Sequence, residues 1–197
     1  MNEMIYKDAK SIADNLVVRL KDECDIINIA GSIRREKDDV KDIEIVCLPN
    51  TETVLIDPAD MFSESTSQVK NTIGFERAVD SLHGETIKGN PQGRYMQIEF
   101  KQLIKLDLFM PLAHDYYRQF AIRTGSWEYS IKIASAWKKL GWVGTPDGLR
   151  LQKECTQIGV NKYKCICHEP TLPIRWTSEE HFFEWLGMKW IEPKFRY

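Results

Sequence analysis

The segment from residue 26 to residue 48 constrains the fold most, because it holds two strand patterns separated by one short turn. The apolar run IINIA (26–30) predicts a buried strand that ends at Gly31, and SIRREK after it predicts a turn of helix. DIEIVCL (42–48) then begins with strict alternation, which predicts a second strand. Alternate side chains of a strand share one face, so Asp42 and Glu44 point to one side and Ile43 and Ile45 to the core.

The remaining patterns predict an α+β fold. Helices are expected over 5–20, 69–82, 114–122, 126–141 and 177–187, and further strands over 94–100, 101–110, 149–152 and 163–167. Most of the polar, proline-containing stretch 49–67 is expected to form a surface excursion. We therefore expect a mixed sheet with flanking helices over residues 1–112, followed by a small helix-plus-hairpin subdomain over residues 113–197.

Composition and charge exclude several classes of protein. The 197 residues carry a net charge of −2, and no apolar run is long enough to span a bilayer. The N-terminus lacks an apolar signal core and the five cysteines have no framework spacing, which favours reduced thiols and an intracellular, cytoplasmic monomer without membrane contact. Residues 1–113 carry −6 and residues 114–197 carry +4, a division that fits a polyanion-handling enzyme and ordinary solvated faces equally well.

The acidic strand and the turn before it point to phosphoryl transfer. Two carboxylates on one face repel each other unless a cation lies between them, and such hard oxygen ligands suit Mg²⁺ or Mn²⁺. An Asp-x-Glu pair alone is a weak signal, but Gly31 and Ser32 stand eleven residues upstream. Backbone N–H groups at the start of a helical turn bind phosphate oxygens, and the guanidinium groups of Arg34 and Arg35 can clamp a phosphate. A phosphate cradle beside a metal-binding pair is an arrangement for phosphoryl transfer.

Four segments spanning residues 31 to 197 carry a resemblance to a known family. They are GSIRREKDDVKDIEIV (31–46), LDLF (106–109), YYRQFAIRTGSWEYS (116–130) and SEEHFFEWLGMKWIEPKFRY (178–197). The first resembles the nucleotidyltransferase signature of family X DNA polymerases, the group typified by DNA polymerase beta. The others resemble, in order, the strand with the third metal carboxylate, the segment around the Thr-Gly-Ser turn, and the C-terminus of that family. The resemblance implies a nucleotidyltransferase palm and a DNA-directed DNA polymerase.

The resemblance also implies a set of site residues. The catalytic and metal-binding residues would be Asp42, Glu44 and Asp107, holding two Mg²⁺ ions, with Mn²⁺ as a substitute. The nucleotide-binding residues would be Gly31, Ser32, Arg35, Thr124, Gly125, Trp127 and Ser130, and the DNA-binding residues would be Arg94, Lys105, Arg123 and Lys132. The implied partners are a nucleoside triphosphate and primer–template or gapped DNA, with release of pyrophosphate in short-gap repair.

The sequence departs from the family pattern in three places. Glu44 stands where the family usually has a second aspartate, and Ile122-Arg123 stands where the best-known members have Tyr-Phe, a pair that helps to exclude a ribose 2′ hydroxyl. The chain begins almost at the palm, so we expect a minimal form without the lyase and helix-hairpin-helix parts, similar to the short viral members. Residues 123–164 would then grip the DNA, weakly and with strong dependence on salt.

Three functions stay open at this point. They are a templated DNA polymerase, a template-independent nucleotidyltransferase acting on a nucleic acid or a smaller acceptor, and a non-catalytic nucleic-acid-binding relic. The complete carboxylate set counts against the relic, and the later family-like segments favour the polymerase. Cys165-x-Cys167-His168 is spaced too closely for the usual paired zinc ligands, so reduced cysteines on a short hairpin are expected. Trp142 is expected to pack rather than to stack on bases.

Overall fold

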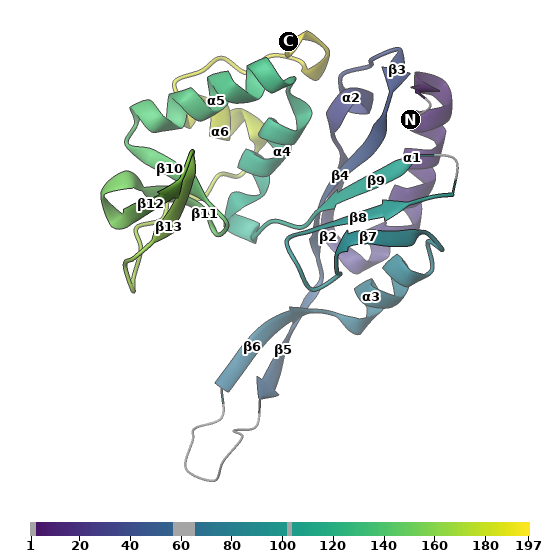
Figure 1. The fold of residues 1–197 in the computed structure, drawn as a ribbon, viewed down its shortest axis with the longest axis horizontal. Helices are drawn as coiled ribbons and strands as arrows, with labels where there is room; N and C mark the ends of the chain where they lie inside the picture. The colour runs from purple at the N-terminus through teal and green to yellow at the C-terminus, as the bar shows by residue number, and fades with distance from the viewer. Residues whose placement is uncertain (1–2, 57–65, 102–103) are drawn as a thin grey trace.

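The computed structural model describes residues 3–56, 66–101 and 104–197 (Figure 1). Its N-terminal part contains β1 (Met4–Ile5), α1 (Tyr6–Leu20), β2 (Cys24–Ile29), α2 (Gly31–Arg34), β3 (Asp39–Val40), β4 (Asp42–Pro49), β5 (Thr51–Ile56), β6 (Thr66–Asn71), α3 (Ile73–Asp80), β7 (Glu85–Gly89), β8 (Tyr95–Glu99) and β9 (Lys105–Phe109). Its C-terminal part contains α4 (Tyr116–Thr124), α5 (Trp127–Lys139), β10 (Trp142–Thr145), β11 (Gly148–Leu151), β12 (Cys155–Gly159), β13 (Lys162–Cys165) and α6 (Glu179–Trp185).

A mixed sheet forms the centre of the N-terminal part. Within the described residues its strand order is β2-β4-β9-β8-β7, with β4 and β9 parallel and the other neighbours antiparallel. One face packs against α1 and α3 in a core of Ala9, Ala13, Leu16, Leu20, Phe75, Val79, Ile43, Ile45, Leu106 and Leu108. This confirms the expected α+β class with a mixed sheet and flanking helices.

The opposite face of the sheet is divided between packing and polar groups. Val46 and Phe109 lie under α4, where they pack with Tyr116 and Phe120. Further toward the start of β4, the same face carries the carboxylates, as the alternation of that strand predicts. The sheet thus keeps its apolar residues under helices and leaves its acidic positions facing the C-terminal part (Figure 1).

A hairpin arm of β5 and β6 departs from the expected surface excursion at 49–67. The arm extends away from the sheet, with pairs running from Thr51 opposite Asn71 to Ile56 opposite Thr66 (Figure 1). Its strands are rich in β-branched residues, whose strand preference outweighs their polarity. Residues 57–65 of that expectation lie outside the described residues. Thr72 accepts a hydrogen bond from the Phe75 amide, so α3 begins at Ile73 rather than near residue 69.

The C-terminal part has its own apolar core and two hairpins, β10–β11 and β12–β13. The core contains Ala121, Tyr129, Ile133, Trp137, Leu149, Trp176, Phe182, Phe183 and Leu186. Trp142 packs edge-on against Trp185 with ring centroids 5.8 Å apart, which confirms its expected packing role. Helix α4 packs on the sheet through Tyr116 and Phe120 and on this core through Ala121, so it belongs to both cores. The boundary at residues 112 and 113 stays a prediction.

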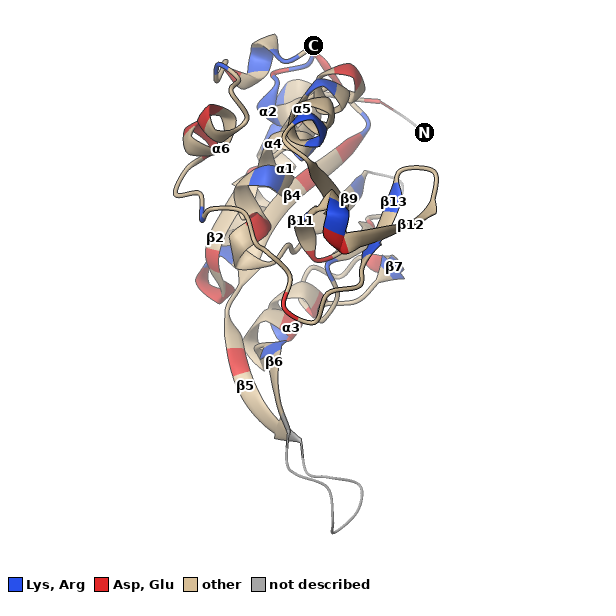
Figure 2. Cartoon of the chain, turned by 90° about the vertical axis from the view of Figure 1, so that its left-hand side faces the viewer, with Lys and Arg blue, Asp and Glu red and all other residues tan. Residues whose placement is uncertain are grey.

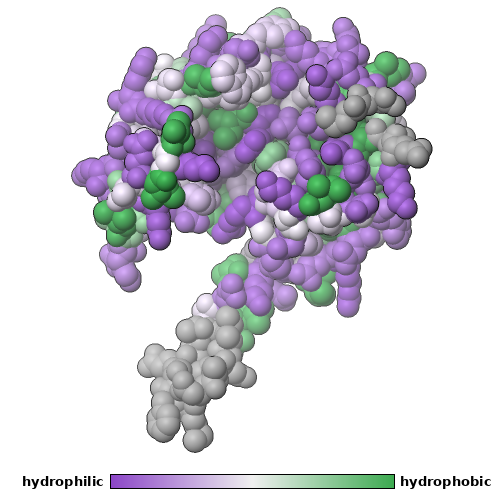
Figure 3. Space-filling view, in the orientation of Figure 1, coloured by the Kyte–Doolittle hydropathy of each residue, from purple (hydrophilic) through white to green (hydrophobic). Residues whose placement is uncertain are grey.

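The surface between the two parts is hydrophilic. Figure 3 shows mostly hydrophilic side chains around a hollow between the N-terminal and C-terminal parts. Lys and Arg residues lie on α5 and on β13 of the C-terminal part (Figure 2).

Candidate active site

Strand register aligns the acidic side chains in two rows on one face of the sheet. Glu44 on β4 lies opposite Asp107 on β9, and Asp107 lies opposite Gln97 on β8. The neighbouring row consists of Asp42, Lys105 and Glu99. Side chains that lie directly opposite each other on adjacent strands are within contact reach. The parallel pairing of β4 with β9 therefore places the three carboxylates that the resemblance implied at neighbouring positions of one sheet face, although β4 and β9 are more than sixty residues apart in sequence.

Asp107 is held in a fixed orientation by its neighbours on β8. Its Oδ1 accepts hydrogen bonds from the Tyr95 hydroxyl at 2.6 Å and from Gln97 Nε2 at 2.8 Å. Hydrogen-bond donors of this kind orient a carboxylate, and they usually accompany a side chain that binds a metal ion. Lys105 lies 3.4 Å from Glu99 Oε1, so its ammonium group is paired within the sheet face.

The site holds more negative charge than its surroundings neutralise. Burial, and after it the nearby Asp42 carboxylate, raises the pKa of Glu44 to about 7, although Arg123 and Arg35 oppose the shift. Burial and then Asp107 likewise raise the pKa of Asp42. In the described part of the chain no three His, Cys, Asp or Glu side chains converge into a ready ligand cluster. Carboxylates with no cation between them repel each other, so surplus charge on hard oxygen donors fits a site for Mg²⁺.

The turn after β2 needs a glycine because of Glu44. Gly31 has a φ of 63°, and a Cβ atom there would collide with Oε2 of Glu44. Both features disfavour other residues: the left-handed conformation strains an L side chain, and the Glu44 carboxylate would have to move to make room for a methyl group. Gly31 therefore lets the start of α2 approach the acidic face closely.

A cavity of about 450 Å³ lies between the turn and the acidic strand. Ser32, Arg35, Asp42 and Glu44 line it, together with Lys37 and Lys41. Ser32 Oγ and Arg35 Nε are buried and have no hydrogen-bond partner among the described residues. Buried polar atoms are nearly always paired, so two such atoms on residues that line one cavity are consistent with a polar ligand there.

Arg34 and Arg35 have different tasks although they are adjacent. The Arg35 guanidinium donates from Nη1 to the carbonyl oxygens of Thr124 at 2.7 Å and Gly125 at 3.0 Å. Arg34 donates instead to Thr124 Oγ1 at 2.7 Å and, with both terminal nitrogens, to Glu179 at 2.8 and 2.9 Å. Arg34 therefore joins α2 to the C-terminal part, and the interpretation of Arg34 as a phosphate clamp was wrong. Only Arg35 of the two faces the cavity.

Glu179 is the centre of a buried network that no sequence pattern indicated. Its carboxylate also accepts two hydrogen bonds from Arg196, at 2.7 and 2.9 Å, and one from Trp190 Nε1 at 2.9 Å. Burial alone would raise its pKa, but the hydrogen bonds from Arg196 and Arg34 outweigh burial and lower the pKa to about 2. The network fixes α6 and the chain terminus against the turn that carries Ser32 and Arg35.

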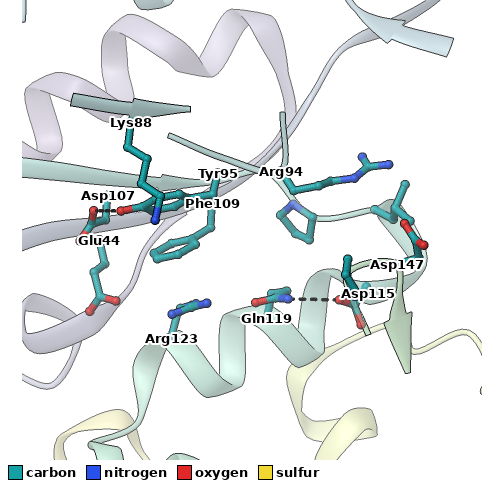
Figure 4. Close-up of a pocket in the computed structure, with 13 residues that line it drawn as sticks. Glu44, Lys88, Arg94, Tyr95, Asp107, Phe109, Asp115, Gln119, Arg123 and Asp147 are labelled. Atoms are coloured by element: carbon teal, nitrogen blue, oxygen red, sulfur yellow. Dashed lines mark hydrogen bonds between the residues drawn. The ribbon is translucent and has the colours of Figure 1, made fainter. Parts of the chain in front are cut away.

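A second cavity of about 490 Å³ lies on the other side of Glu44 (Figure 4). Arg94 and Arg123, both expected to bind DNA, line it together with Asp107. The Arg123 guanidinium lies 4.0 Å from the centroid of the Phe109 ring, and its buried Nε has no hydrogen-bond partner among the described residues. Lys88 lines the same cavity, although its strand β7 is exposed throughout and shows no burial alternation that could have singled it out.

Several expected nucleotide-binding and DNA-binding residues line neither cavity. They are Gly31, Thr124, Gly125, Trp127, Ser130, Lys105 and Lys132. Thr124 is fully buried with its hydroxyl engaged by Arg34, and the Ser130 hydroxyl donates to the Ile122 carbonyl oxygen at 2.7 Å. Trp127 is 75% exposed at the start of α5. The contribution of Thr124 and Gly125 here is to anchor Arg35 through their carbonyl groups, and a direct role for any of the seven stays a prediction.

The fold and the site together define a mixed α+β protein consistent with a polymerase beta-like palm and a thumb-like C-terminal region. Residues 120–197 match the family model described as DNA polymerase beta thumb. That match supports a family X polymerase-like relationship and, at a coarse level, a DNA-binding, polymerase-like function. No curated protein matches the sequence. No helix in the described ranges is long and apolar enough to cross a membrane.

Proposed function

We propose that this chain is a DNA-directed DNA polymerase of the family X kind. It would transfer a deoxynucleotide to a primer 3′ hydroxyl, with release of pyrophosphate, during the filling of short gaps. The observation that carries the proposal is the cavity that Asp42 and Glu44 line together with Ser32 and Arg35, each of which has a buried polar atom without a partner among the described residues. A triphosphate satisfies both atoms and brings its own negative charge next to a cation site.

The turn after β2 would bind the phosphates of the nucleotide. The Ser32 hydroxyl and the Arg35 guanidinium would donate to the β and γ phosphates. The carbonyl groups of Thr124 and Gly125 already hold one Arg35 nitrogen, so the guanidinium is oriented before the nucleotide arrives. Donors fixed in advance in a partly buried site stabilise charge that develops on a leaving group more than mobile donors do.

The carboxylates of Asp42, Glu44 and Asp107 would hold two Mg²⁺ ions, or Mn²⁺. Two such cations activate an attacking hydroxyl and neutralise the leaving oxygen. The protein itself orients this ligand, because Tyr95 and Gln97 on the neighbouring strand donate hydrogen bonds to Asp107. Partners of this kind are part of a metal site, and their loss usually costs about 10–100-fold in affinity or activity.

The second cavity supports a nucleic-acid partner. Arg94, Arg123 and Lys88 bring positive charge to its wall, and the turn between β10 and β11 of the thumb-like region contributes Pro146 and Asp147. Positive charge next to the acidic row suits a primer–template whose phosphates lie along the cavity while its 3′ end reaches Asp107. The thumb match favours this partner over a small acceptor.

Primer extension in Mg²⁺ on gapped, single-stranded and blunt DNA tests the proposal. We expect extension only where a template base is available, and a fall of more than about 100-fold in D42N and D107N, since loss of a ligand costs more than loss of its support. Asp80→Asn, an exposed aspartate at the end of α3, is the matched control and should keep full activity. Untemplated tailing would favour the template-independent enzyme. Absence of pyrophosphate release, with all variants folded, would identify a relic.

A further inference from the structure

The hairpin β12–β13 places two cysteines directly opposite each other. Cys155 pairs with Cys165, and the Ile166 amide donates to the Glu154 carbonyl oxygen at 3.0 Å. In an antiparallel ladder, a bond between the residues just outside a pair makes it a non-hydrogen-bonded pair, whose Cα atoms are about 4.5 Å apart. A disulfide needs Cα atoms about 4.4–6.8 Å apart, so the backbone already has the spacing for a bridge.

The two thiols are free and both are half-buried, which leaves them in reach of a small solute. Burial and contact with Cys165 raise the pKa of Cys155, which agrees with the two sulfur atoms lying against each other. Cys24 and Cys47 are also in contact, but they differ from the hairpin pair in strand register and in access. Cys47 is fully buried, and it pairs with Ile27 rather than with Cys24. Geometry and access therefore coincide only at the hairpin pair among the described cysteine contacts.

We propose that Cys155 and Cys165 form an oxidisable dithiol, a modification site that a hydroperoxide converts into a disulfide. With hydrogen peroxide, one thiolate attacks a peroxide oxygen, the O–O bond breaks, a sulfenic acid forms, and the leaving hydroxide takes up a proton to become water. The opposite thiol then attacks the sulfenic sulfur, the S–S bond forms and a second water leaves. The two sulfurs lose two electrons in total and the peroxide gains them. Exchange with a dithiol restores both thiols.

The position of the pair gives the modification a structural effect. The strand β13 packs against β10, whose turn to β11 lines the second cavity. The hairpin carries the exposed Lys162 and Lys164, and Lys138 on α5 donates to Asn161 Oδ1 at 2.9 Å in its turn. A bridge at the base of the hairpin fixes the strands that present these lysines. The chemistry itself does not depend on the proposed polymerase function.

The test is peroxide treatment of the full chain, alkylation of free thiols, digestion without reductant and mass spectrometry. We expect one linked peptide pair containing Cys155 and Cys165, lighter by two hydrogen atoms, and lost after dithiothreitol. Its yield should exceed any other cysteine pair by at least about tenfold, because the two thiols are already in contact. C155S or C165S should abolish it, and C167S, which changes the exposed neighbouring thiol, should retain it.

Two outcomes would overturn the assignment. One is a dominant link through Cys167 or through Cys24 and Cys47. The other is no link at a peroxide dose that oxidises the exposed Cys167 in the same sample. Circular dichroism of each serine variant checks that loss of the link does not reflect loss of the fold.

Discussion

Replacing Glu179 by glutamine should weaken the interactions that hold the N-terminal and C-terminal parts of the protein together. Glu179 is 5% exposed and accepts five hydrogen bonds, two from Arg34, two from Arg196 and one from Trp190. Arg196 is fully buried, so loss of the carboxylate leaves its charge without compensation. The glutamine amide nitrogen also points a donor at the guanidinium donors. The structure therefore predicts a large loss of stability from a nearly isosteric change.

Two lines of reasoning give the same magnitude. Breaking a buried ion pair by removing one partner costs about 3–5 kcal/mol. Independently, a carboxyl whose pKa falls from 4.5 to about 2 on folding is stabilised in its charged form by roughly 3 kcal/mol. We expect E179Q to lower the free energy of unfolding by about 3 kcal/mol and the Tm by about 6–12 °C for a chain of this size.

The same shift fixes the pH dependence. The pKa of Glu179 is lower in the folded chain than in the unfolded chain, so its contribution is complete above about pH 4.5 and is lost as the pH falls toward about 2. The stability difference between wild type and E179Q should be constant at neutral pH. It should shrink across that acidic window, because protonation of Glu179 then does what the substitution does.

Urea unfolding, followed by circular dichroism and by tryptophan fluorescence at several pH values, measures both effects. Glu180→Gln is the matched control: it changes the neighbouring, exposed carboxylate in the same first turn of α6, and should cost under about 1 kcal/mol through the helix dipole alone. Equal losses in E179Q and E180Q, or a loss in E179Q below 1 kcal/mol, would refute the reasoning.

Two further substitutions test the acidic face. Gly31→Ala and Gly187→Ala both place a methyl group at a positive φ, and each should lower the free energy of unfolding by about 1–2 kcal/mol. Only the methyl group at residue 31 collides with Glu44, so only Gly31→Ala should lower nucleotide transfer, by about 100-fold. Equal activity in the two variants would show that Glu44 is not part of the site. Tyr95→Phe removes one hydrogen bond to Asp107 and should lower kcat by about 10–100-fold, measured over a Mg²⁺ titration, while the Tm changes little. An unchanged kcat would show that Tyr95 does not orient the Asp107 carboxylate.

Local patterns predicted the acidic strand well because strand periodicity is a property of neighbouring residues. The alternation at 42–48 gave both the burial of Ile43 and Ile45 and the shared face of Asp42 and Glu44. Asp107 needed the family resemblance, since the parallel register that brings it beside Glu44 is not encoded in either strand alone.

Long-range partners explain what the patterns could not predict. Arg34 and Arg35 are chemically identical neighbours, and Arg34 is distinguished by its bonds to Thr124 and to Glu179, which is 145 residues away. The arm of β5 and β6 was hidden for a related reason. Its strands are exposed and pair only with each other, so no buried face imposes an apolar alternation on the sequence.

The short helix α2 couples ligand binding to the docking of the N-terminal and C-terminal parts. Arg34 within it is bound to α6, and the adjacent Arg35 faces the cavity, so whatever steadies one steadies the other. Coupling of this kind is reciprocal: if docking of α6 raises the affinity for a triphosphate by some factor, the triphosphate strengthens docking by the same factor. Substitutions in α6 should then weaken nucleotide binding without touching the nucleotide, and bound nucleotide should slow amide exchange in α6.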